Sequence, residues 1–361
     1  MESYLHLDPN LAVSTTIGEE AVEWHSVCQP PFALYGFYGE HGEHPFFRLP
    51  EALADGVSEG VSKLHRESAG GRVRFSTDSP ILAVRAVFRA VSRSSHRSLL
   101  SEAGFDLYTD GEFGSRFLKE FRMPYDMTDR YEQSVKLNSE RLRAYTVHFP
   151  IHAAVESLEI GIRPGSRLEQ GASYRPLEPI LFYGSSIVHG TAASRPGNVY
   201  PSMISRILNV DHKNLGFSGN AKGEPLLAQW MAERPMSAFV CDYDHNAPTS
   251  EHLAQTHYPL YEIIREKNPA VPYVMVTRPN HRTALSSSAR ETILRRRDVI
   301  MSSYLKARAN GDRNVHFVDG MSFFPTPLAN DGSVDGTHPN DLGFSYMANA
   351  IASVLRDAWE M

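Results

Sequence analysis

The sequence has few of the features that mark disulfide-stabilised, secreted or membrane-spanning chains. It contains only two cysteines, Cys28 and Cys241, and Cys241 lies in the apolar run 238–241, which predicts a buried strand. We therefore expect no structural disulfide. No apolar run approaches the ~20 residues of a membrane span. The first residues, MESYLHLD, also lack the basic and apolar regions of a secretory signal, so we expect a cytoplasmic protein without a membrane partner.

The chain also lacks an excess of positive charge. Its formal net charge is −6, and the 36 basic residues are interspersed with 42 acidic ones. Without a basic face for a polyanion, nucleic acid is not an expected partner. The length of 361 residues and the hydrophobic content of 42% are sufficient for two cores. The sequence does not indicate an oligomeric state, and a homo-oligomer stays open.

Residues 1–165 show mainly the pattern of β-strands. In the run 82–89, the even positions are apolar, whereas Arg85 and Arg89 fall on the opposite face. This period of two is typical of a half-buried strand, and 158–162 repeats it. Short strands separated by turn residues predict an N-terminal antiparallel β-sandwich of the jelly-roll type.

The pattern changes after a polar, proline-containing stretch over 163–176, which predicts a linker. From 176 to 361, strands and helices alternate, which predicts an α/β domain with a parallel sheet covered on both faces. The expected strands are 180–183, 214–217, 238–241, 273–276 and 315–318, and helices are expected at 253–266 and 289–308.

Three polar motifs each follow one of these strands. They are GSSIVHG at 184–190, GFSGNA at 216–221 and DYDHNA at 242–247, and a fourth, DGTHP at 335–339, precedes the last expected helix. In open α/β sheets, ligands bind beyond the carboxyl ends of the strands. We therefore expect the four motifs to meet at one edge of the sheet.

The residue types in these motifs are those of nucleophilic catalysis. Ser186 is the expected nucleophile, His338 the base that takes its proton, and Asp335 the carboxylate that orients the imidazole. Taken singly, Ser186 could be a helix N-cap. The turn at 331–335 hints at a calcium loop but lacks the downstream Glu ligand.

Oxyanion donors are expected close to these residues. The backbone N–H groups of Ser186 and Gly219 and the side-chain amide of Asn246 are the candidates, with Asn220 as a rival amide. His189 either contacts substrate or caps its helix, and the two interpretations have equal weight.

Together the four motifs resemble those of the SGNH (GDSL-type) hydrolases, named for their Ser, Gly, Asn and His. Upstream, GFDLY at 104–108 is similar to the GxDLY signature of an N-terminal domain in one bacterial branch of these esterases, with GGRVRF at 70–75 as its neighbouring strand. The resemblance covers nearly the whole chain. It implies a flavodoxin-like three-layer catalytic domain after the sandwich. Ser185 departs from the family, which usually carries Asp before the nucleophile.

The resemblance implies a serine esterase that needs no metal and no organic cofactor. Its expected substrate is a small-molecule or carbohydrate ester, with O-acetyl as the acyl group. A lipase or thioesterase of the same fold and a non-catalytic carbohydrate-binding protein are the alternatives. The histidine-rich segment 40–44 (EHGEH) is interpreted as an exposed loop near the active site rather than a metal site.

Overall fold

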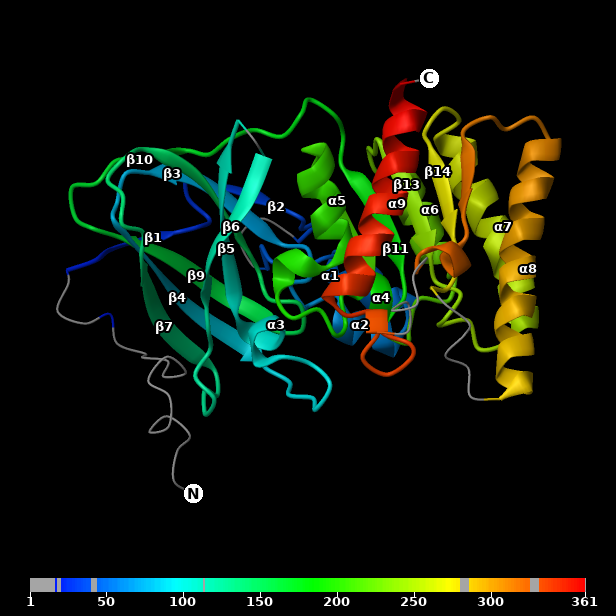
Figure 1. The fold of residues 1–361 in the computed structure, drawn as a ribbon, viewed down its shortest axis with the longest axis horizontal. Helices are drawn as coiled ribbons and strands as arrows, with labels where there is room; N and C mark the ends of the chain where they lie inside the picture. Colours follow the sequence, from blue (N-terminus) through cyan, green and yellow to red (C-terminus); the bar gives the residue numbers. More distant parts are fainter. Residues whose placement is uncertain are drawn as a thin grey trace.

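The computed structural model divides the chain into a β-sheet half and an α/β half that lie side by side (Figure 1). It describes residues 17, 21–39, 44–112, 114–279, 286–324 and 331–360. The protein belongs to the mixed α/β class that the sequence predicts, with antiparallel sheets first and a parallel sheet after them.

The first half contains ten strands and three short helices among the described residues. The strands are β1 Glu23–Ser26, β2 Ala33–Tyr35, β3 Arg72–Thr77, β4 Ile81–Ala90, β5 Phe105–Gly111, β6 Gly114–Phe121, β7 Arg130–Lys136, β8 Arg143–His148, β9 Ala154–Ile162 and β10 Leu168–Gln170. The helices are α1 Glu51–Val57, α2 Glu59–Leu64 and α3 Leu99–Ala103.

These strands form two antiparallel sheets around a common core. One sheet has the order β1-β9-β4-β7 and the other β10-β3-β8-β5-β6, with β2 paired to β3. The core between them takes Val84 and Ile160 from the first sheet and Phe75 and Val147 from the second. On the outer face, Arg85 pairs with glutamates of the neighbouring strands. The alternation expected for β4 is therefore confirmed, and the jelly-roll connection stays a prediction.

The second half is built on a five-stranded parallel sheet of order β12-β11-β13-β14-β15. Its strands are β11 Ile180–Gly184, β12 His212–Gly216, β13 Ala238–Asp242, β14 Tyr273–Val276 and β15 Val315–Val318. Its helices are α4 Ser186–His189, α5 Tyr200–Leu208, α6 Pro225–Ala232, α7 Ser250–Lys267, α8 Ser287–Ala309 and α9 Asp341–Glu360, with 3₁₀ turns η3 Pro196–Asn198 and η4 Gly320–Ser322.

Both faces of the parallel sheet are buried under helices, as Figure 1 shows. In β11, Ile180 and Phe182 point to the core shared with α5 and α9, and Leu181 and Tyr183 point to the core shared with α6 and α7. A strand buried on both faces has no polar side to alternate with, which is why these segments appear as continuous apolar runs in the sequence. The three-layer arrangement is the one that the sequence predicts.

Two segments differ from the expected pattern. Glu51–Leu64, within the part of the chain expected to be mainly strand, forms the helices α1 and α2, and their side chains Ala54 and Val61 join the core of the α/β half. The helix α1 packs on α6, so this part of the first half depends on a surface that the second half provides. Leu168–Gln170, inside the expected linker, pairs with β3 as the edge strand β10.

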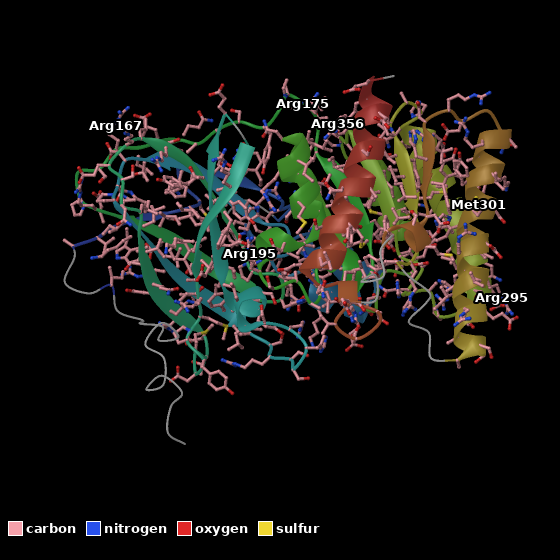
Figure 2. The ribbon with its side chains drawn as sticks, viewed as in Figure 1. Arg167, Arg175, Arg195, Arg295, Met301 and Arg356 are labelled. Carbon is pink, nitrogen blue, oxygen red and sulfur yellow. The ribbon has the colours of Figure 1, made fainter. Side chains whose placement is uncertain are left out.

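A buried carboxylate joins the two halves. Asp106 of β5, in the GFDLY motif, is fully buried and accepts hydrogen bonds from Arg195 Nη1 at 3.0 Å and from the backbone N–H of Gly197 at 2.8 Å. His148 Nδ1 lies 3.1 Å from the same carboxylate. Figure 2 labels Arg195 at this junction. Burial alone would raise the pKa of Asp106, but His148, Arg195 and Gly197 lower it below the ordinary value, so the carboxylate stays ionised.

The other sequence-based exclusions concern cysteines and membrane spans. Cys28 is exposed and Cys241 is buried, and neither is in a disulfide. Over the described ranges, every helix is too short or too polar to cross a bilayer.

Replacing Asp106 by Ala should destabilise the protein by about 3–5 kcal/mol, because Arg195 would remain at the junction without its buried partner. Urea unfolding followed by circular dichroism measures the change. Glu140→Ala, which removes an exposed partner of Arg163, is the control and should have little effect. Equal stability of the two variants would contradict the importance of the buried carboxylate.

Candidate active site

Ser186 lies at the first turn of α4, directly after β11. The side chain of Ser185, not that of Ser186, caps this helix by accepting a hydrogen bond from the N–H of Ile187 at 3.2 Å. The hydroxyl of Ser186 is therefore not used as a cap. Its backbone N–H, at the first helical position, has no intrahelical acceptor. Both groups of Ser186 are available at the carboxyl edge of the sheet.

Close packing brings α4 onto the strand ends. A Cβ at Gly216, the last residue of β12, would lie 2.2 Å from the backbone nitrogen of His189. Only glycine leaves room for the helix to approach the strand at this point. The strand order places β11 between β12 and β13, so Ser186 stands where the chain connections turn in opposite directions, the usual ligand site of such sheets.

Ser186, His338 and Asp335 form a continuous hydrogen-bonded chain. His338 Nε2 lies 2.9 Å from Ser186 Oγ, and His338 Nδ1 lies 2.7 Å from Asp335 Oδ2. The side chains of His338 and Asp335 are 21% and 39% exposed, so the site is open to solvent. With Nδ1–H donating to Asp335, Nε2 is free to accept the serine proton, as a general base must.

The backbone of the loop holds Asp335 in its ionised form. Its Oδ1 accepts the backbone N–H groups of Thr337 at 2.9 Å and His338 at 2.8 Å. Burial by itself raises the pKa of Asp335, but these bonds and the imidazole outweigh it and lower the pKa to about 2. Gly336 makes the tight turn between them, with a φ of 78° that favours glycine.

Arg278 secures the same loop from the end of β14. Its Nη2 donates to the carbonyl of Gly336 at 3.1 Å and to Thr337 Oγ1 at 3.3 Å. Sequence reasoning did not identify Arg278, because nothing in its own neighbourhood links it to the loop 58 residues later in the chain.

The expected oxyanion donors lie on neighbouring loops. Asn246 Nδ2 donates to the carbonyl of Phe217 at 2.8 Å, which places the amide against the loop that carries Gly219 and leaves its second hydrogen for a ligand. Gly219 is exposed, has a φ of 73°, and has open space around it. Asn220 instead turns toward α2, where its side chain lies against Gly60.

The structure corrects the interpretation of His189. Its side chain is fully buried, so it does not contact a ligand at the surface, and its Nε2 lies 3.3 Å from the carbonyl oxygen of Ile151 rather than at the end of α4. His189 Nδ1 lies 2.9 Å from Ser218 Oγ, and Nε2 lies 3.0 Å from Glu67 Oε2 in the first half of the chain. The spacing of three residues from Ser186 could not indicate this, because His189 points away from the sheet edge toward the sandwich.

One residue of the sandwich half reaches the catalytic histidine. His96, in the loop between β4 and α3, is exposed, and its ring centroid lies 5.9 Å from that of His338. The sequence offers no sign of this contact. The histidine-rich segment 40–44, expected to be an exposed loop, lies outside the described residues except for His44.

The structure has a cavity beside the loop of Asp335 and His338 and another between the two halves. A cavity of about 290 Å³ adjoins the catalytic loop and is lined by Asp244, His245, Arg278, Ala289, Thr292, Ile293 and Arg296. A larger one of about 750 Å³ lies between the sandwich and the helices α5 and α9. No triad residue lines either cavity. We take the smaller cavity as part of the active site because Arg278, which lines it, bonds to the carbonyl of Gly336.

The fold and the hydrogen-bonded chain of Ser186, His338 and Asp335 define a serine hydrolase.

Comparison with known families agrees with that class. The GDSL-like lipase/acylhydrolase family matches residues 177–356, and the GxDLY family, the N-terminus of SGNH-hydrolase-type esterases, matches residues 22–168. The chain belongs to the GDSL-type (SGNH) hydrolases that carry an N-terminal GxDLY domain.

Solved structures show the same two-part fold. A protein assigned as a GDSL-like lipase in Bacteroides ovatus is 27% identical, with a TM-score of 0.83 over 93% of this chain and 98% of its own. A salicylyl-acyltransferase from a tetracycline biosynthetic pathway is 21% identical, with a TM-score of 0.74 over 91% and 95%. An acetyl xylan esterase from Butyrivibrio proteoclasticus is 11% identical, with a TM-score of 0.57 over 94% and 99%. No curated protein matches the chain in sequence.

Asn246→Ala should lower kcat by about 100-fold or more and change KM little, because an oxyanion donor strengthens its bond as negative charge develops. Steady-state kinetics on a p-nitrophenyl ester measure both constants. Asn220→Ala is a matched control, since it removes an amide that bonds to Ser218 in the same loop. A kcat loss confined to Asn220→Ala would reverse the two roles.

The acid side of the pH profile should report a single ionisation. Asp335, with its pKa lowered to about 2, is ionised above pH ~4, so only His338 has to lose a proton to become the base. We expect log(kcat/KM) to rise with pH with a slope of one. A slope of two between pH 4 and 7 would show that a second group must also ionise.

Proposed function

We propose that the protein is a serine esterase that hydrolyses short O-acyl esters, with O-acetyl groups on carbohydrates as the preferred substrates. The observation that carries the proposal is the chain of hydrogen bonds from Ser186 through His338 to Asp335, at 2.9 and 2.7 Å, beside the loops of Gly219 and Asn246. These groups supply a nucleophile, a base and charge stabilisation.

The reaction follows from the placement of these groups. Ser186 Oγ attacks the ester carbonyl while His338 Nε2 takes its proton, and Asp335 stabilises the resulting imidazolium. The N–H groups of Ser186 and Gly219 and the amide of Asn246 receive the developing oxyanion. His338 then protonates the departing alcohol, and water, activated by the same imidazole, releases the acid from Ser186.

The surroundings of the triad favour a small acyl group on a polar alcohol. The adjoining cavity is lined largely by charged and polar side chains, including Asp244, Arg278 and Arg296, which suit a short acyl group better than a long alkyl chain. His96 adds a polar side chain from the sandwich half. The acetyl xylan esterase with the same two-part fold supports a carbohydrate acetyl ester, and this support rests on the likeness of fold alone.

A panel of p-nitrophenyl esters from acetyl to decanoyl, run beside acetylated sugars, tests the proposal. We expect kcat/KM to be highest for acetyl and to fall with chain length, and we expect acetate release from acetylated sugar. A maximum at octanoyl or decanoyl would instead favour a lipase-type activity.

Covalent labelling separates catalysis from carbohydrate binding alone. A fluorophosphonate should add one adduct at Ser186, mapped by peptide mass spectrometry, and Ser186→Ala should reduce activity at least 1,000-fold. Labelling at another serine would reject the assignment. Faster transfer of the acyl group to an added alcohol than to water would indicate an acyltransferase.

A further inference from the structure

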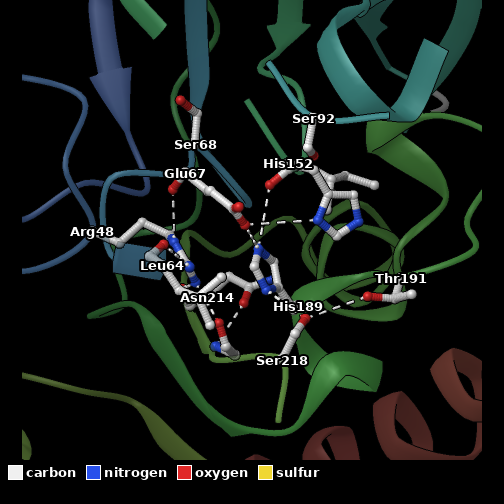
Figure 3. A network of polar contacts seen from close by, with 12 residues as sticks. Arg48, Leu64, Glu67, Ser68, Ser92, His152, His189, Thr191, Asn214 and Ser218 are labelled. Atoms are coloured by element: carbon white, nitrogen blue, oxygen red, sulfur yellow. Dashed lines mark hydrogen bonds and ion pairs between the residues drawn. The ribbon is translucent and has the colours of Figure 1, made fainter. Parts of the chain in front are cut away.

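Residues 217–221, which include Gly219, form a segment that is called the oxyanion loop below. Next to it, three side chains from separate parts of the chain converge on one point (Figure 3). Glu67 follows α2, His152 lies between β8 and β9, and His189 ends α4. Glu67 Oε2 lies 3.0 Å from His189 Nε2 and 3.7 Å from His152 Nδ1, and the three residues offer one ligand atom each within 4.8 Å of the other two. None of the three is a catalytic residue of the proposed reaction.

These separations suit a four-coordinate metal ion. A zinc ion bound at about 2.0–2.2 Å to nitrogen and oxygen ligands in a tetrahedron keeps its ligand atoms about 3.3 Å apart. The two separations from Glu67 Oε2, 3.0 Å and 3.7 Å, fall on either side of that value, so small side-chain movements would suffice. Two histidines and one glutamate are also an established zinc ligand set.

The surroundings of the cluster complete the requirements of a site. Ser218 Oγ lies 2.9 Å from His189 Nδ1, where it can fix the ring with Nε2 toward the metal. A cavity of about 500 Å³ reaches both Glu67 and His152 and gives an entry path and room for a water ligand. His152 is almost fully buried. Its Nδ1 faces Glu67, and its other ring nitrogen, Nε2, has no hydrogen-bond partner in the described structure.

We propose that Glu67, His152 and His189 bind one divalent transition-metal ion of the zinc type, with water as the fourth ligand. The ion would connect the two halves, since Glu67 and His152 come from the sandwich half and His189 from the α/β half. Through Ser218, which precedes Gly219, it would also stiffen the oxyanion loop. Its role is structural, because none of its three ligands belongs to the Ser186–His338–Asp335 chain.

Cobalt binding by the full-length, untagged protein tests this site directly. After dialysis against EDTA, Co²⁺ should bind with a stoichiometry of one and give the intense visible absorption of a four-coordinate ion, and Zn²⁺ should displace it. Zn²⁺ should also raise the unfolding temperature, because it binds only the folded site. Absence of stoichiometric binding would reject the proposal and leave Glu67 as a hydrogen-bond partner of His189.

The informative variant is His152→Phe, which keeps a ring of similar size but removes a ligand. Because His152 Nδ1 is 3.7 Å from Glu67, the variant leaves the shorter Glu67–His189 contact intact. We expect Co²⁺ affinity to fall at least about tenfold and the Zn²⁺-dependent rise in unfolding temperature to disappear. Glu67→Gln should have the same effects.

Two controls exclude binding elsewhere. His338→Gln removes the catalytic imidazole, and His25→Ala removes a histidine that faces a single carboxylate, Glu23, at 3.6 Å. Both variants should bind Co²⁺ like the unmodified protein. Binding that survives in His152→Phe and is lost in His338→Gln would place the ion at the catalytic pair and overturn the proposal.

Discussion

The structure depends on buried charged side chains that hold the sandwich against the parallel-sheet half. Asp106 accepts bonds from Arg195 and Gly197 across the junction. Arg48, fully buried, donates in the same way to the carbonyls of Asn214 at 3.0 Å and Gly216 at 2.6 Å, at the end of β12. Buried charges are tolerated only when their partners are in place. The two halves are thereby held in one relative position, and the catalytic edge is set by both.

Residues of the N-terminal half also contact the loops of the candidate active site. Arg48 holds the end of β12, from which the chain enters the loop of Gly219. Glu67 reaches His189, which in turn lies against Ser218, and His96 lies beside His338. The loop that carries Gly219 and the loop that carries His338 are therefore each in contact with a residue of the first half, Arg48 and His96 respectively. The GxDLY domain therefore contributes a residue, His96, that lies beside the hydrogen-bonded chain of Ser186, His338 and Asp335.

The sequence was sufficient to predict the parallel sheet and the three residues that form the hydrogen-bonded chain Ser186–His338–Asp335. Strands buried on both faces appear as apolar runs, and β14, Tyr273–Val276, has the bounds that its run predicts. Ser186, Gly219 and Asn246 follow such runs, and the rule that ligands bind at strand ends places them at one edge of the sheet. Asp335 and His338 are close in sequence, and a short turn with Gly336 is all that their pairing needs.

Contacts between distant segments could not be predicted in the same way. The helices α1 and α2 are stabilised by a surface that the other half provides, so local patterns in 51–64 did not reveal them. His189, three residues after Ser186, was expected either to contact substrate or to cap its helix, but α4 ends with that side chain directed toward Glu67 and His152. The sequence by itself determined the class of fold and the residues of the Ser186–His338–Asp335 chain, because strand periodicity and short-range turns are local properties. Only the tertiary structure decided which residues of the first half meet the site, because that depends on how two independently patterned surfaces pack.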